Sequence, residues 1–194
     1  MKSLVLLVLM FGTFAFASTV LAGAKSPVAC ALMDEKEALA LVGGPLGEVF
    51  KEEEMPTMEN GRDHNSVCGF FPKGYKIQEA DSPPERGLQL QLHVMQTEAA
   101  AKTFYERVLE SNQDMTRMSG SPLASAKITT LNGIGKAAFL ADDKIELEPG
   151  SSCAVATVGF LKGNVMGQVQ VWKKSGPAGE IAKSAAKKVV TKLP

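Results

Sequence analysis

Histidine, aromatic residues and net charge are all scarce in this chain of 194 residues. Only two histidines and 6% aromatic residues are present, and 21 basic residues balance 21 acidic ones. Balanced charge provides no field that would attract nucleic acid or an anionic membrane. The glycines form neither G-x-G-x-x-G after a strand nor G-x-x-x-x-G-K-S/T. We therefore expect no nucleic-acid partner and no phosphate-binding loop.

A recognisable arrangement of catalytic residues is also missing. A Ser/His/Asp or Cys/His site needs nucleophile and base to converge, and nothing in the sequence brings His64 or His93 toward a nucleophile. The carboxylates of Glu52 to Glu54 are consecutive and do not share a face. Cys153 has no base nearby in the sequence that would activate it. We expect a protein without enzymatic activity or cofactor, with both histidines at its surface.

The N-terminus has the sequence features of a secretory signal peptide. Lys2 precedes an apolar run from Leu4 to Phe16, and small residues suited to cleavage surround Ala22. The run is shorter than the ~20 apolar residues of a transmembrane helix. We predict a cleaved signal peptide at 1–22, followed by a single domain at 23–194 with no later membrane span. The protein is then secreted or periplasmic in a bacterium.

Three cysteines are present without a C-x-x-C motif, which gives no support to a thioredoxin-like redox role. An exported chain favours one disulfide and one remaining thiol. A Cys30–Cys68 bond is the first choice because it would connect the first helix to the first strand. A Cys68–Cys153 bond between two strands is the alternative, and spacing alone does not decide between them.

The strongest strand pattern runs from Cys153 to Lys174 and turns at Gly163-Asn164. Both turn residues tolerate positive φ, which favours a two-residue hairpin. That turn predicts four cross-strand pairs: Lys162 with Val165, Phe160 with Gly167, Val158 with Val169, and Ala156 with Val171. One face of the ribbon becomes apolar and the other mixed, so burial should fix the register.

Other segments complete the predicted architecture. Expected strands lie at 66–72, 87–95 and 136–141, and expected helices at 34–42, at 97 to about 111, and from 177 onward. The helices beginning near Thr97 and Pro177 both carry an apolar stripe that could cover the apolar face of the sheet. The resulting fold class is α+β, a mainly antiparallel sheet of about five strands with helices packed on one face.

A ligand or an envelope protein would most plausibly contact the mixed outer face of this sheet. Its candidate residues come from two predicted strands: Gln89, Gln91, His93, Gln168, Gln170 and Trp172. Trp172 is the candidate anchor, because an aromatic residue on a polar strand face often marks a contact site. The hypothesis fails if Trp172 is fully buried.

Two Met-x-x-Met pairs suggest an alternative function. Met55 and Met58 form one pair, followed by His64, while Met115 and Met118 form the other, and all lie in predicted loops. Thioether sulfur is a soft ligand that selects Cu(I). The alternative is therefore a periplasmic Cu(I)-binding protein, although methionines also fill gaps between loops and a core.

Four phrases together resemble small bacterial secreted and lipoprotein domains of unknown function, related to extracellular sensor domains of bacterial Ser/Thr kinases. The phrases are CALMDEKEALALVGGPLG, SVCGFF, LNGIGKAAF and VGFLKGNVMGQVQV. The resemblance implies a Cys30–Cys68 bridge and a binding or sensing role, with no catalytic residues to carry over. The chain lacks the lipobox of the lipoprotein members, so the resemblance implies no lipid tether.

Overall fold

The structure is a computed structural model that describes residues 27–47, 49–54, 62–75, 83–117, 126–148 and 151–194. The predicted signal peptide at 1–22 lies outside these residues. Eleven elements follow along the described chain: α1 (Ala29–Leu32), α2 (Glu35–Val42), β1 (Phe50–Glu54), β2 (Arg62–Phe70), β3 (Arg86–Met95), α3 (Glu98–Arg117), β4 (Lys127–Leu131), β5 (Ala137–Glu148), β6 (Ser151–Lys162), β7 (Val165–Lys173) and α4 (Ala178–Lys192).

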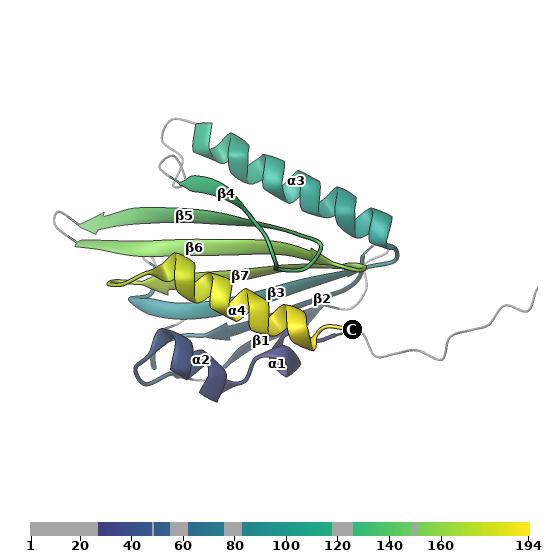
Figure 1. The fold of residues 1–194 in the computed structure, drawn as a ribbon. Helices are drawn as coiled ribbons and strands as arrows, with labels where there is room; N and C mark the ends of the chain where they lie inside the picture. The colour runs from purple at the N-terminus through teal and green to yellow at the C-terminus, as the bar shows by residue number, and fades with distance from the viewer. Residues whose placement is uncertain (1–26, 48, 55–61, 76–82, 118–125, 149–150) are drawn as a thin grey trace, which may run out of the picture.

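All seven strands form one antiparallel sheet in the order β1-β2-β3-β7-β6-β5-β4 (Figure 1). The α+β fold class is thus confirmed, with seven strands where about five were expected. The two strands missing from the prediction, β1 and β4, are the edges of the sheet. Edge strands are often short and rich in charge, which hides them from a search for apolar alternation. Phe50–Glu54 is such a segment, with the sequence FKEEE.

The central hairpin has the predicted register. Lys162 pairs with Val165, and the three further pairs follow as expected down to Ala156 with Val171. Gly167 lies opposite Phe160, and a Cβ atom built on Gly167 would lie 2.2 Å from the Phe160 ring. The absence of a side chain there lets the ring lie flat across β7 inside the core. Strand β5 continues past the predicted end at residue 141 to Glu148 and pairs with β6 along this length.

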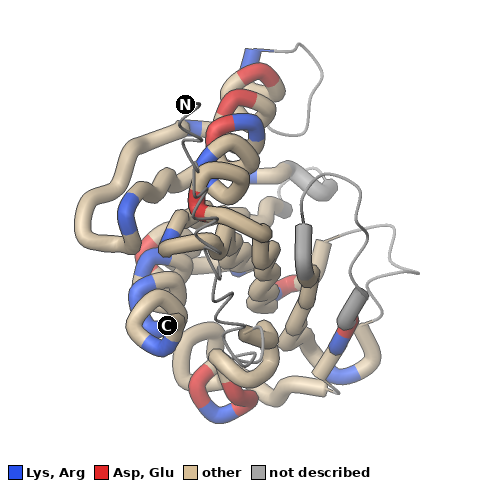
Figure 2. Tube along the Cα trace, turned by 90° about the vertical axis from the view of Figure 1, so that its right-hand side faces the viewer, with Lys and Arg blue, Asp and Glu red and all other residues tan. Residues whose placement is uncertain are grey.

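The main core lies between one face of the sheet and helices α1, α2 and α4. Leu88, Leu90 and Leu92 of β3 are fully buried there, as are Val158 and Val169 of the hairpin. The buried side of α4 consists largely of alanines, so this helix can approach the strands closely. The opposite side of α4 is rich in lysine, whereas α3 mixes both signs of charge (Figure 2).

Helix α3 packs on the other face of the sheet, so the expectation that all helices share one face is wrong for this element (Figure 1). Its Tyr105 ring lies 5.8 Å from that of Phe139, within a second cluster that includes Leu161 and Met166. These strand residues alternate with the main-core positions and form a small apolar patch on the outer face. The patch gives the apolar stripe of α3 a place to bury.

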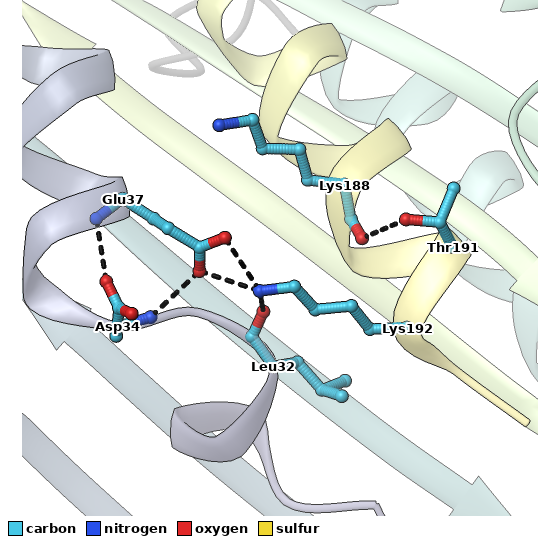
Figure 3. A network of polar contacts seen from close by, with 6 residues as sticks. All are labelled: Leu32, Asp34, Glu37, Lys188, Thr191 and Lys192. Carbon is cyan, nitrogen blue, oxygen red and sulfur yellow. Dashed lines mark hydrogen bonds and ion pairs between the residues drawn. The ribbon is translucent and has the colours of Figure 1, made fainter.

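Hydrogen bonds join the helices of the main core to one another (Figure 3) and also to the sheet. Asp34 and Glu37 form a capping box at the start of α2. The Lys192 ammonium donates to the Leu32 carbonyl at 2.9 Å and to both Glu37 carboxylate oxygens at 2.7 Å. Lys162 of β6 donates to carbonyls near the end of α4, including that of Leu193 at 2.6 Å.

Candidate functional site

Four glutamines predicted as ligand contacts lie together on two neighbouring strands. Gln89 pairs with Gln170, and Gln91 pairs with Gln168, across the β3–β7 junction. All four are partly exposed. Directly opposite residues on an antiparallel pair have Cβ atoms about 5 Å apart, so four amide groups share a small area. We call these four residues the glutamine face.

The glutamine face is surrounded by uncharged residues on the two flanking strands. Its immediate cross-strand neighbours are Val67 and Gly69 on β2 and Thr157 and Gly159 on β6. Each glutamine amide carries both donors and an acceptor. This area can therefore form hydrogen bonds with an uncharged polar ligand without having to desolvate a charge.

An aromatic cluster borders the glutamine face at one end. The Phe71 ring centroid lies 5.6 Å from that of Trp172 and 5.3 Å from that of Tyr75. Phe71 is buried, whereas Trp172 and Tyr75 are partly exposed, so the condition that Trp172 not be fully buried is met. A Cβ atom on Gly69 or Gly87 would lie within 3 Å of the Phe71 ring, so these two glycines leave the ring room to lie over β2 and β3.

Helix α3 limits the exposed face at the other end. His93 follows the glutamines along β3, but its side chain is only 4% exposed and its ring lies 4.8 Å from that of Phe104. The expectation of a surface histidine is wrong for His93, because α3 covers this part of the outer face. His93 therefore packs beneath α3 and exposes little surface to a ligand. His64 was expected in a loop, but it lies in β2, paired with Val94.

The titratable groups near the aromatic cluster are poorly suited to acid–base or nucleophilic work. Burial, and secondarily the Cys153 sulfur, raises the pKa of Tyr75. Burial also raises the pKa of the Cys153 thiol, which makes it a weaker nucleophile at neutral pH. Its Sγ atom is 3.5 Å from the Pro84 carbonyl oxygen, to which it donates. This environment is that of a buried structural thiol.

The cysteine pairing follows the first of the two alternatives. Cys30 and Cys68 form a disulfide, and Cys153 is a buried thiol outside it. The bond joins α1 to β2, as its position in the sequence suggested.

The Cu(I) alternative stays a prediction. Met55, Met58 and Met118 lie outside the described residues. Met115 was expected in a loop but belongs to α3, which continues six residues beyond the expected end at about Ser111. Among the described residues, no group of three or more His, Cys, Asp or Glu side chains could hold a metal ion.

Three residues of this area were absent from the sequence-based set: Phe71, Tyr75 and Thr157. Phe71 precedes Pro72, and the sequence pattern placed it only at the end of a predicted strand. The usable signal was the pair of glycines, Gly69 and Gly87, because isolated glycines inside strands often mark close approach of another group. In this structure that group is the Phe71 ring.

No protein-family model and no curated protein sequence matches the chain. Among solved structures, the fold is similar to that of the extracellular domain of PknH from Mycobacterium tuberculosis, with a TM-score of 0.50 and 13% sequence identity. The match covers 84% of this chain and 93% of that chain. The resemblance to extracellular domains of bacterial Ser/Thr kinases is thus confirmed as a likeness of fold. At this identity it assigns no residue a role.

None of the helices in the described part of the chain is long and apolar enough to cross a bilayer.

Proposed function

We propose that this protein is an exported, non-catalytic binding module whose ligand sits on the glutamine face against Trp172. The observation that carries the proposal is the pairing of four partly exposed glutamines beside a partly exposed aromatic cluster. This area is flanked by α3 yet remains partly open and uncharged.

The chemistry of the site favours an uncharged ligand with both polar groups and an apolar face. The amides supply donors and acceptors, and the exposed part of Trp172 supplies a flat apolar surface. A neutral oligosaccharide presents this combination along its whole length. An anionic ligand would find no counter-charge among the cross-strand neighbours of the glutamines.

Export is supported by three independent features. The first 22 residues have signal-peptide grammar, a disulfide joins Cys30 to Cys68, and the fold is shared with an extracellular domain. Disulfides persist mainly in oxidising compartments. Placement at the bacterial envelope, periplasmic or secreted, is part of the same proposal.

Trp172 makes the proposal testable because it is the only tryptophan of the chain. Its fluorescence emission reports on the proposed site without any label. The purified exported protein would be titrated with neutral probes, namely N-acetylglucosamine oligomers and malto-oligosaccharides. A saturable change in emission is expected with at least one series.

The matched variants are Gln89→Ala/Gln170→Ala on the glutamine face and Gln96→Ala/Gln113→Ala as control. Both control residues are exposed and lie away from the face. Loss of two neutral hydrogen bonds should weaken binding about tenfold or more in the first variant, and the control should bind like the wild type. The proposal is wrong if no probe gives a saturable change, or if the two variants bind equally well.

A further inference from the structure

A cavity lies on the opposite side of the sheet from the glutamine face. Its volume is about 330 Å³. It is formed where α2 ends and where the paired ends of β3 and β7 meet the chain leading to α4. Its described lining includes Gly44, Glu85, Arg86, Lys173 and Lys174. We call this cavity the basic pocket.

Like charges face each other inside the basic pocket. Arg86 and Lys173 are direct cross-strand partners, and both are partly buried. Like charges directly opposite on a strand pair destabilise the sheet. Lys174 adds a third cation. Glu85, whose carboxylate lies 3.2 Å from the Lys174 ammonium, is the only acidic residue among the described lining residues. Three cations and one carboxylate give this described lining a net charge of +2.

The two facing cations have weak partners in the described part of the chain. Arg86 Nη2 donates to the Pro45 carbonyl at 3.3 Å, and Lys173 Nζ donates to the Val42 carbonyl at 3.5 Å. The Val42 carbonyl belongs to the last residue of α2, where a cation is favoured by the helix dipole, whereas Pro45 lies three residues beyond the end of that helix. One cation would serve that purpose, so the second calls for a further explanation.

Arg86 retains unused donors beside this cavity. A guanidinium has five N–H groups, and among the described residues Arg86 forms the single hydrogen bond to Pro45, with its buried Nε left without an acceptor. Gly44 lies directly against this group, since a Cβ atom there would be 2.5 Å from Arg86 Cζ. The guanidinium is thus held in place by the close approach of a glycine at φ 72°, which few other residues could provide.

We propose that the basic pocket binds a small anionic group, a phosphate or a carboxylate, between Arg86 and Lys173, with the more exposed Lys174 at its rim. An oxyanion there compensates the facing cations and accepts hydrogen bonds from donors that the Val42 and Pro45 carbonyls do not use. The pocket is distinct from the glutamine face, because the side chains of Arg86 and Lys173 alternate with Gly87 and Trp172 and so point to the opposite side of the sheet. The proposal therefore stands or falls independently of the neutral ligand proposed above.

The test is an NMR titration of the intact exported protein at constant ionic strength, kept with sodium chloride. Inorganic phosphate is one probe and succinate the other, which separates a phosphate ligand from a carboxylate ligand. Saturable shifts are expected for the backbone amides of residues 43, 44 and 173–175 with at least one probe. Chloride at the same ionic strength should not reproduce them.

Three charge-neutralising variants make the test specific. Lys173→Gln should weaken binding of the effective probe about tenfold or more, because it removes one charge-assisted hydrogen bond. Lys174→Gln is a second variant at a more exposed position, with 57% of its side chain accessible, and it preserves the test if Lys173→Gln unfolds. Lys127→Gln on β4 is the matched control, exposed and outside the pocket. Shifts that stay linear with both probes, or binding that is equal in the pocket and control variants, would overturn the proposal.

Discussion

At the scale of single residues, Lys192 connects three helices through one side chain. Its ammonium contacts the Leu32 carbonyl and the Glu37 carboxylate, so α4 is joined to both N-terminal helices (Figure 3). The hydrogen bond from Lys192, followed by the backbone hydrogen bond from Asp34, lowers the pKa of Glu37 from its ordinary value of 4.5. A lowered carboxyl pKa links this contact to the pH dependence of folding.

We expect Lys192→Met to reduce the free energy of unfolding at neutral pH by about 1 kcal/mol, a small value because both partners are partly solvated. In the wild type, Glu37 contributes stability above its unfolded pKa and loses it as pH falls through its lower folded pKa. The variant should therefore lose less stability than the wild type when the pH falls below about 4.5. Urea unfolding at several pH values, with exposed Lys187→Met as control, measures both effects. Parallel pH profiles for the two proteins would contradict this role of Lys192.

At the scale of elements, α1 is too short to be stable alone and depends on its attachments. It has four residues and no side-chain cap. The Cys30–Cys68 disulfide fixes it to β2, and the Ala29 backbone N–H donates to the Ser66 hydroxyl at 3.0 Å. The disulfide closes a loop across a sequence separation of 38 residues, which constrains the unfolded chain considerably.

Reduction of the wild type should lower the free energy of unfolding by about 2–4 kcal/mol, as expected for a loop of this size. The same loss should occur in Cys153→Ala, because the buried Cys153 thiol takes no part in the bond. Cys30→Ala/Cys68→Ala should already be destabilised and should not respond to reductant. Denaturant melts with and without reductant measure all three. If the response to reductant disappeared in Cys153→Ala, the bond would have to include Cys153, which would contradict the Cys30–Cys68 pairing.

The elements that could be predicted from the sequence are those with strong local signals. The Gly163-Asn164 turn together with one-sided apolar alternation was enough to obtain the full register of β6 and β7. The capping box of α2 was equally local. The side of the sheet on which α3 packs could not be predicted from the local sequence. The stripe on α3 shows only that one side is buried, and its partner is the outer patch around Met166 and Phe139.

The candidate site also has parts that could be predicted from the sequence and parts that could not. The glutamines could be placed on one face because the period-two alternation in β3 and β7 determines to which side of the sheet each side chain points. The pairing of β3 with β7 then brings the glutamines together. His93 shares that alternation, yet α3 buries it. The aromatic cluster and the basic pocket depend on how Phe71 and α2 return to the sheet, which no short pattern encodes.

At the scale of the whole molecule, the sheet separates a stabilising side from a partly open side. The helices α1, α2 and α4 cover the main core on one side, and α3 covers only the smaller patch on the other (Figure 1). The glutamine face lies on this second side between the aromatic cluster and α3. A seven-stranded sheet covered by one helix on this side leaves room for a partner on the remaining strands.

The proposed binding role of the glutamine face can be measured most directly on protein purified from the cells that naturally produce it. Small molecules released on denaturation would be compared by mass spectrometry for the wild type, Gln89→Ala/Gln170→Ala and the Gln96→Ala/Gln113→Ala control. We predict one compound that accompanies the wild type and the control but not the glutamine-face variant, and that changes Trp172 emission when added back. Equal amounts of every released compound in all three proteins would contradict a binding role for this face.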